Sequence, residues 1–486
     1  MGQCYITRRG TKTGGAVEQL GIYPTGNDGR PMGNVTVLSN VTNLSKYPFI
    51  ENSNVLTVAL PESLRGLADY CFQKCTGLQD ITISNKVTTI PQYCFDGCSS
   101  LSKVTLPKGL TTIGQYAFRN CTGLYDLVIP DDIESLTIQS YAFSECQGLD
   151  NDTVTKLATK TYGTIYANAF ANLIGITEVT TAKVYNYYFS GCTNLKKVTI
   201  LNAFSDGSFG SNVFDGCSNL TTVILPDNAK IITSNMFNGT KKLTTINFPS
   251  SITQIGVNAF SNCTSLKNLD IPDNASYTLG SSAFYNSGIT EECAKNIVAH
   301  ATSIGDNLFQ SCSSLVNVEV PVFANYMFNN CTNLKSATST GVTGTIKTTG
   351  NKVFYGCSAL ERAKIADGTT IIGSCIFDGC KALKTVYLPS SITTATNSSL
   401  TSTSSSYYAF YNCTALEDVQ LGQDWNMSLR LNVSNNLTVD SMVAMFNSLK
   451  DLTGDTAKTL TLGSTNLAKL TDEQKEIATN KNWTLA

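Results

Sequence analysis

Apolar residues recur at a fixed spacing along most of this chain. A phenylalanine is followed three residues later by a small residue, usually cysteine, and three residues after that usually by leucine, as in Phe95, Cys98 and Leu101. A repeat of this kind predicts a solenoid, in which each coil buries its apolar side only against its neighbours. The anchoring phenylalanine returns after mostly 23 to 25 residues, at positions 72, 95, 118, 143, 170, 189, 214, 237, 260, 284, 309, 328, 354, 377 and 410. One more copy starts at Phe49, which gives about sixteen coils from 49 to 421.

Each repeat predicts one short strand and one compact turn. The run from Val104 to Leu106 alternates apolar and polar residues and is rich in strand formers, and Pro107 ends it because proline has no N–H to donate. Ile113 and Gly114 predict the next corner, and the segment leading to the phenylalanine predicts a helical or 3-10 turn. Equivalent strands of successive coils then pair in parallel. We therefore predict an α/β repeat solenoid: a curved, right-handed superhelix with one parallel β-sheet and short helical or 3-10 segments on its convex side.

The two ends and three interior stretches depart from the repeat. We predict a Gly-rich N-terminal arm and cap over residues 1–48, the solenoid over 49–421 and a C-terminal cap over 422–486. The cap is expected to run helix, strand, helix, strand, at 440–452, 459–463, from the capping box Thr471–Gln474 to about 480, and at 483–485. Residues 288–305, which include a predicted helix from Glu291 to Ala299, 335–350 and 390–407 are insertions. Insertions in solenoids often lie on the binding face.

The repeat resembles the BspA-like class of bacterial leucine-rich repeats. The pattern that carries the resemblance is Leu-x-x-Val-x-Leu-Pro followed by Ile-Gly-x-x-Ala-Phe-x-x-Cys-x-x-Leu, as read from Leu101 to Leu124. It covers about residues 49–421. The resemblance implies a leucine-rich-repeat superhelix and a role in binding rather than catalysis, since members are mostly surface-associated bacterial proteins implicated in adhesion to host proteins and to other cells. Similar repeats also occur in phage-encoded proteins.

The seventeen cysteines are interpreted as packing residues rather than as a disulfide framework. Twelve occupy the same repeat position, at 75, 98, 121, 146, 192, 217, 263, 312, 331, 357, 380 and 413. Other coils place Asn52, Leu173, Thr240 or Ser287 there. Buried free cysteine behaves as a small apolar residue. An odd number of thiols, one per coil, does not predict pairing.

Composition narrows the function classes. The net charge is −2 with no basic stripe, and nucleic-acid binding needs clustered Lys and Arg, so a nucleic-acid partner is not expected. The N-terminus lacks the apolar core of a secretory signal, and no stretch approaches eighteen apolar residues, so membrane insertion is not expected. Charged residues are only 14 % of the chain, and a neutral polar surface suits an extracellular or particle-surface protein.

The sequence offers little catalytic chemistry. His300 is the single histidine, which argues against a catalytic triad and against a His-rich metal site. Cys71, Cys75, Cys94 and Cys98 form two neighbouring Cys-x-x-x-Cys pairs, for which a zinc site is the alternative to packing. We expect no enzyme activity, no cofactor and no metal.

The outward face of the strands is the predicted partner-binding surface. Alternation within each strand puts these side chains on it: Lys103, Asp126, Lys197, Thr199, Thr222, Thr245, Asn247, Asn268, Asp270, Asn317, Glu319, Arg362, Lys364 and Tyr387. The face is mixed in charge, which suits a protein or glycan on a cell surface.

Three hypotheses of function follow. The first is a non-enzymatic recognition protein displayed on a phage or phage-like particle, as a tail, fibre or head-surface component, whose N-terminal arm contacts neighbouring virion proteins. The second is an exported bacterial cell-surface adhesin that binds host protein or glycan. The third is an intracellular scaffold.

Overall fold

The computed structural model describes residues 21–22, 32–44, 48–133, 135–159, 163–341 and 348–486. Most of the predicted Gly-rich arm lies outside these residues. The chain divides into two compact units, Met1–Pro249 (unit 1) and Ser250–Ala486 (unit 2), and each unit is described by itself.

Unit 1 consists of short strands and one helix. Its elements are β1 (Gly21–Ile22), β2 (Gly33–Val37), β3 (Val55–Ala59), β4 (Asp80–Thr82), β5 (Thr89–Ile90), β6 (Lys103–Thr105), β7 (Thr112–Ile113), β8 (Asp126–Val128), β9 (Thr137–Ile138), α1 (Asn151–Thr159), β10 (Glu178–Thr181), β11 (Lys197–Ile200), β12 (Thr222–Ile224), β13 (Ile231–Ile232) and β14 (Thr245–Ile246).

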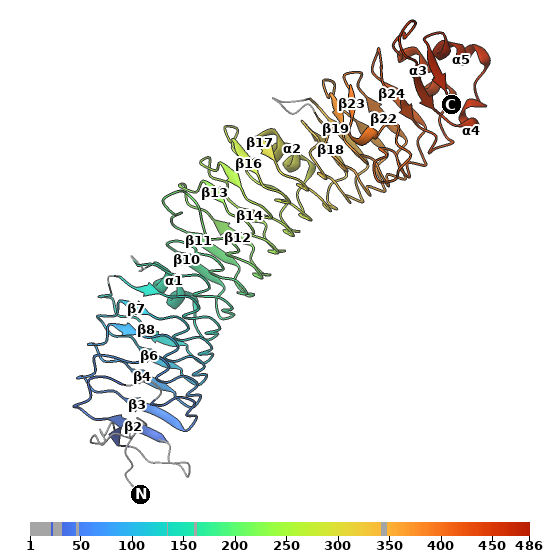
Figure 1. The fold of residues 1–486 in the computed structure, drawn as a ribbon. Helices are drawn as coiled ribbons and strands as arrows, with labels where there is room; N and C mark the ends of the chain where they lie inside the picture. The colour runs from blue at the N-terminus through green and yellow to red at the C-terminus, as the bar shows by residue number, and fades with distance from the viewer. Residues whose placement is uncertain (1–20, 23–31, 45–47, 134, 160–162, 342–347) are drawn as a thin grey trace. The chain divides into compact units, whose positions relative to one another are not determined.

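The main strands of unit 1 pair in parallel in the orders β2–β3–β4–β6–β8 and β10–β11–β12–β14, with α1 between the two sheets in the chain (Figure 1). A second set of short strands, β5–β7–β9, pairs in parallel at the predicted corner. Strand β2 pairs with β3, so the row of strands begins before the first repeated phenylalanine. Strand β1 pairs antiparallel with β2.

Unit 2 has the same construction with more helix. Its elements are β15 (Gln254–Ile255), β16 (Tyr277–Leu279), α2 (Glu291–Ala299), β17 (Ala301–Ile304), β18 (Asn317–Val320), β19 (Ser336–Ser339), β20 (Arg362–Lys364), β21 (Ile371–Ile372), β22 (Thr385–Leu388), β23 (Thr394–Ala395), η1 (Thr396–Ser398), β24 (Asp418–Leu421), β25 (Leu429–Arg430), α3 (Val439–Ser448), β26 (Lys458–Thr461), α4 (Ser464–Leu467), α5 (Asp472–Thr479) and β27 (Trp483–Leu485).

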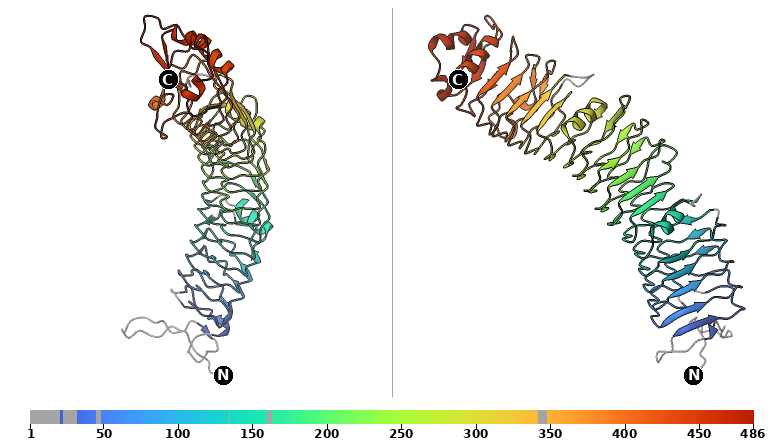
Figure 2. Two further views of the ribbon diagram at one scale, coloured as in Figure 1. Left: turned by 90° about the vertical axis from the view of Figure 1, so that its right-hand side faces the viewer. Right: turned by 180° about the vertical axis from the view of Figure 1, so that it is seen from behind.

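The main strands of unit 2 form the parallel row β18–β19–β20–β22–β24, which Figure 2 shows side by side, and the C-terminal segment adds the parallel row β25–β26–β27. The helix predicted at 291–299 is confirmed, as are the helices and strands predicted after residue 439. Helix α3 ends at Ser448 rather than at Leu452, because Leu449 is already extended. Helix α5 begins with the predicted capping box of Thr471 and Gln474.

The predicted fold class, a parallel repeat solenoid, is confirmed in both units. The expectation of one parallel sheet is corrected: α1 takes the place of a main strand in one coil of unit 1 and divides the row of strands. This helix was missed from sequence. Its signal is the helical spacing of Val154, Leu157 and Ala158, which are buried, after the coil of Phe143.

The segments that carry the phenylalanines are not the predicted helical or 3-10 segments but runs of non-helical turns. Alternate N–H groups in them bond within the coil and to the next coil. In one coil the N–H groups of Ala117, Arg119 and Cys121 close turns within the coil, on residues 114, 116 and 118. The N–H groups of Tyr116, Phe118 and Asn120 instead reach carbonyls of the next coil, at 2.8–3.1 Å. Tyr116 and Asn120 adopt positive φ angles of 57° and 59°, which interrupt a helix.

The phenylalanines form a continuous column inside each unit. In unit 1 the rings of Phe72, Phe95 and Phe118 are fully buried and stack at centroid separations of 5.2 Å, almost parallel. At the second corner Gly114 passes so close to the preceding coil that a Cβ would meet the backbone nitrogen of Gln92 at 2.6 Å. Both features hold successive coils at one short separation.

The cysteines of the repeat both pack in the core and donate hydrogen bonds between coils. The sixteen cysteines in the described residues are all free and buried. At eleven repeat positions the thiol donates to the carbonyl of the phenylalanine one coil earlier, as Cys121 does to Phe95 at 3.1 Å. Burial raises the pKa of the Cys121 thiol well above its ordinary value, so the thiol keeps the proton that it donates.

Truncation of a column phenylalanine should destabilise the fold strongly. We expect Phe118→Ala to lower the free energy of unfolding by about 3–5 kcal/mol, since it removes a ring packed between two others. Urea denaturation measures the change. Tyr125→Ala is the matched control, because Tyr125 is 65 % exposed, and an equal loss in both variants would contradict the packing role.

The thiols should be free but protected. Counting thiols with an aromatic disulfide reagent in denaturant, without reductant, should find about seventeen, and the folded chain should react only slowly. A count near one in denaturant would reveal a disulfide framework and contradict the packing interpretation.

Candidate partner-binding surface

Helix α2 lies on the strand side of unit 2 and takes the place of a main strand. Thr290 caps its start by accepting from the N–H of Cys293 at 3.3 Å. Its apolar side, which includes Ala294 and Ile297, is buried. Its polar side presents Glu292 and Lys295 to solvent beside β18.

Glu291 supplies the hydrogen bonds that a strand would supply. In the regular coils one carbonyl accepts from two successive N–H groups of the next coil, as Val316 does from Lys335 and Ser336 at 2.7 and 3.2 Å. At the helix, the Glu291 carboxylate accepts from the N–H groups of Val316 and Asn317 at 3.1 and 3.3 Å instead. Partial burial opposes ionisation, but the N–H of Glu291 itself and these two backbone donors together outweigh it, and the pKa of Glu291 lies below its ordinary value.

Helix α1 of unit 1 uses the same device with an amide. The side-chain oxygen of Asn151 accepts from the N–H groups of Thr177 and Glu178 at 2.7 and 3.1 Å. Thr155, one turn later, accepts from the N–H of Thr180 at 3.1 Å. The edge of the following strand is therefore satisfied by helix side chains in both units.

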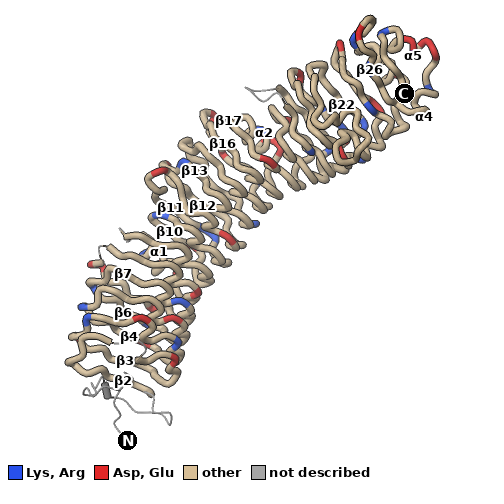
Figure 3. The backbone as a smooth tube through the Cα atoms, viewed as in Figure 1, with Lys and Arg blue, Asp and Glu red and all other residues tan. Residues whose placement is uncertain are grey.

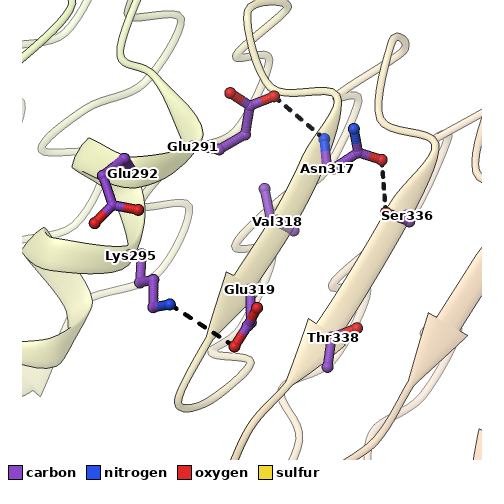
Figure 4. A pocket seen from close by; sticks show the side chains of 8 residues that line it. All are labelled: Glu291, Glu292, Lys295, Asn317, Val318, Glu319, Ser336 and Thr338. Carbon is purple, nitrogen blue, oxygen red and sulfur yellow. Dashed lines mark hydrogen bonds and ion pairs between the residues drawn. The ribbon is translucent and has the colours of Figure 1, made fainter.

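A polar groove of about 280 Å³ lies between α2 and the first strands of the row. Lys295 forms an ion pair with Glu319 across it at 3.8 Å, and Ser336 donates to Asn317 at 2.7 Å (Figure 4). The lining residues are Glu291, Glu292, Lys295, Asn317, Val318, Glu319, Ser336 and Thr338.

The charge changes sign along the strands beyond the groove. The register aligns Glu319 with Thr338 and Lys364, and Asn317 with Ser336 and Arg362. The side nearest α2 is thus acidic, the middle neutral and the side at β20 basic. In each unit the remaining charged residues are scattered with both signs interspersed (Figure 3).

On the basic part of the surface, the ring of Tyr387 contacts Lys364. The Lys364 ammonium lies 5.5 Å from the ring centroid of Tyr387, and the Tyr387 hydroxyl donates to Asp367 at 2.7 Å. Burial, together with the hydrogen bond and charge of Asp367, raises the pKa of Tyr387 to about 12, so the hydroxyl stays protonated at neutral pH.

All fourteen residues predicted for this surface lie outside the core, and their role in binding stays a prediction. In unit 1, Lys103 pairs with Asp126 at 2.8 Å. Asn247 is occupied, since its amide bonds both the N–H and the carbonyl of Leu225. Asn268 in unit 2 accepts from Thr290 at 2.8 Å. The remaining ones are Lys197, Thr199, Thr222, Thr245, Asp270, Asn317, Glu319, Arg362, Lys364 and Tyr387.

Sequence reasoning predicted only two of the eight residues that line the groove. It predicted Asn317 and Glu319 but not Glu292 or Lys295, because the helix was recognised without its place beside the strands. The signal was present in the sequence, since Glu291, Glu292 and Lys295 lie on the polar side of a helix that starts where a strand is due.

No group of three or more His, Cys, Asp or Glu side chains suited to a metal ion occurs within the described residues. At the proposed zinc alternative, Cys75 and Cys98 donate to the carbonyls of Phe49 and Phe72. His300 ends α2, with its ring nitrogen Nδ1 3.0 Å from the Asn296 carbonyl. The described helices are also short: α3 has ten residues, and none could cross a bilayer.

Parallel strands, a buried leucine and phenylalanine repeat and a polar strand face define the class of leucine-rich-repeat solenoids. Within that class, a family model described as "BspA type Leucine rich repeat region (6 copies)" matches residues 28–150, 134–209, 182–316, 292–407 and 323–430. The chain belongs to this family. A comparison with curated protein sequences finds no match.

Solved structures with similar repeats include three bacterial leucine-rich-repeat proteins. A leucine-rich repeat protein from Bacteroides ovatus is 20 % identical, with 99 % of this chain and 98 % of that one covered and a TM-score of 0.38. A leucine rich cell surface protein from Faecalibacterium prausnitzii is 18 % identical, with 85 % and 95 % covered and a TM-score of 0.28. A leucine-rich repeat protein from Eubacterium ventriosum is 18 % identical, with 56 % and 93 % covered and a TM-score of 0.30.

Loss of the Glu291 charge should weaken unit 2 in a pH-dependent way. Because the pKa is lower in the folded state, the stabilisation is present above the ordinary value of 4.5 and disappears as the pH falls through the folded value. We expect Glu291→Gln to lower the free energy of unfolding by about 0.5–1 kcal/mol at pH 7, because solvent screens a part-exposed carboxylate. Glu292→Gln, one residue along, is the control for urea denaturation at pH 7 and pH 3. A deficit that persists unchanged at pH 3 would contradict the charge-based explanation.

Proposed function

We propose that this chain is a non-enzymatic recognition protein that binds a macromolecular partner across the strand face of its coils. The observation that carries the proposal is that interior and surface positions of each repeat have different roles. The interior positions are committed to packing and to bonds between coils, whereas the fourteen predicted positions all lie outside the core. The groove beside α2 adds a concave place on the same face. A protein or glycan on a cell surface is the partner that this mixed polar face suits.

We further propose display on a phage or phage-like particle, as a tail, fibre or head-surface component. Support comes from the sixteen described cysteines, which are free and buried, as expected of a chain that folds in a reducing cytoplasm. The second candidate is an exported bacterial cell-surface adhesin, which membership of the BspA-type family favours. Mass spectrometry of purified particles and of washed cell envelopes distinguishes the two: recovery in envelopes and not in particles overturns the first.

Charge reversal on the strand face should weaken binding without unfolding the chain. We expect Arg362→Glu with Lys364→Glu to weaken the binding of labelled protein to intact host cells by at least about tenfold, which corresponds to about 1.4 kcal/mol. Both side chains are exposed, so the melting temperature should change by no more than about 2 °C.

The matched control is Lys241→Glu with Lys242→Glu, which makes the same charge change in an exposed turn of unit 1. Equal loss of binding in the control would mean that net charge, and not the strand face, governs binding. Unchanged binding in the Arg362 and Lys364 variant would exclude this part of the face.

A further inference from the structure

A buried carboxylate in unit 2 has no positive partner. Asp378 directly follows the column residue Phe377, and only 8 % of its surface is exposed. Among the described residues, no hydrogen bond or ion pair reaches the Asp378 carboxylate. A buried charge without such a partner is unfavourable.

Two tyrosines flank Asp378 in the neighbouring coils. Gly356 donates its N–H to the Asp378 carbonyl at 2.8 Å, and Gly379 donates to the Tyr411 carbonyl at 2.9 Å. These bonds place Asp378 between Tyr355 and Tyr411, which are themselves 38 % and 39 % exposed. Asp378 is thus a buried residue between two residues whose aromatic side chains are exposed.

Unit 1 shows what an aspartate binds at this repeat position. Asp96 directly follows the column residue Phe95, and equivalent backbone bonds of 2.7 Å join Lys74 to Asp96 and Gly97 to Arg119. The Arg119 guanidinium donates to both carboxylate oxygens of Asp96, at 2.8 and 2.9 Å, and the Asp96 side chain is only 4 % exposed. The same guanidinium lies 4.5 Å from the ring centroid of Tyr116.

The residue that corresponds to Arg119 beside Asp378 is Tyr411. The aspartate therefore keeps its buried position while the cation that pairs with it in unit 1 is missing from the chain. A third aspartate at this position, Asp215, follows Phe214 and is exposed to water. Of these three aspartates only Asp96 and Asp378 are buried, and only Asp96 has an arginine at this position of the next coil.

The nearest cation does not fill the site. The Lys352 ammonium lies over the rings of Tyr355 and Tyr326, at 5.3 and 6.0 Å from their centroids, and forms no described ion pair with Asp378. Burial raises the pKa of the Asp378 carboxyl to about 6, an effect that Lys352 only partly opposes. The neighbouring thiols of Cys375, Cys380 and Cys413 stay neutral, since burial raises their pKa values too.

We propose that Asp378, Tyr355 and Tyr411 form a site for the guanidinium of an arginine side chain from a partner protein. Arginine suits it because its planar fork pairs with both carboxylate oxygens and stacks on aromatic rings, which an ammonium does less well. The site belongs to the phenylalanine turn rather than to the strand face, so it is a second contact surface, independent of the one proposed above.

The test uses the full chain and two capped tripeptides, Gly-Arg-Gly and Gly-Lys-Gly, as probes. Carbon-13 NMR of labelled aspartate should show that the arginine probe binds and lowers the pKa of Asp378 from about 6 to below about 5, whereas the lysine probe binds at least about tenfold more weakly. Asp378→Asn should abolish binding of the arginine probe. Asp215→Asn, at the exposed equivalent position, should leave it unchanged. Equal binding of both probes, or arginine binding retained by Asp378→Asn, overturns the proposal.

A second variant tests the geometry of the site. Tyr411→Arg places in unit 2 the residue that unit 1 uses, so it should lower the pKa of Asp378 and block the arginine probe. In the unaltered chain the raised pKa means that stability falls as the pH rises from about 4 to about 6, because the folded state holds this proton more tightly than the unfolded chain. In the Tyr411→Arg variant this decrease in stability with rising pH should disappear. An unchanged pKa of Asp378 in a folded Tyr411→Arg protein would show that the site does not accept a guanidinium. Neither result depends on Arg362 or Lys364, so the strand-face proposal stands or falls separately.

Discussion

The separation between successive coils, about 5 Å, is the constraint on which the rest of each unit depends. One parallel strand pair, one stacked pair of phenylalanine rings and one thiol-to-carbonyl bond all fit that separation, as at Phe95, Phe118 and Cys121. Because the three contacts act at different points around the coil, a residue that disturbs one of them disturbs the others. This explains why phenylalanine recurs at the column position in all sixteen coils, whereas four coils replace the cysteine with Asn52, Leu173, Thr240 or Ser287.

The same separation dictates unusual backbone geometry. In the coils from Phe72 to Phe377, the residue two before the phenylalanine has a positive φ, which turns its N–H toward the next coil. Several of these coils use asparagine there, at 168, 212, 235, 258 and 307. Tyrosine is disfavoured in this conformation. Tyr70, Tyr93, Tyr116 and Tyr141 nevertheless occupy it in successive coils and stack at 4.8–5.0 Å. Aromatic stacking of about 0.5–1.5 kcal/mol per pair offsets the backbone strain.

The sequence allowed the fold and the interior to be predicted, because they rest on contacts that repeat. The column from Phe72 to Phe410 and the helix at 291–299 follow directly from spacing. Helix α1 was missed although Val154, Leu157 and Ala158 have helical spacing, and Asn151 supplies the bonds of the absent strand. Most of the groove was missed because its residues meet through the stacking of coils. The separation of Lys295 and Glu319 in the chain does not reveal their contact.

A repeat protein provides internal controls for its own exceptions. Each position occurs many times, so the usual partner of a residue type can be observed elsewhere in the same chain. Glu291 and Asn151 lie in helices that replace a main strand. Their side chains accept the hydrogen bonds that the strand would accept, so their role is structural. Asp378 is different, because the equivalent Asp96 pairs with Arg119 and no arginine pairs with Asp378. A polar residue that breaks the repeat and finds no partner within the fold can gain free energy by binding a partner molecule. A missing internal partner therefore identifies a binding position better than solvent exposure does.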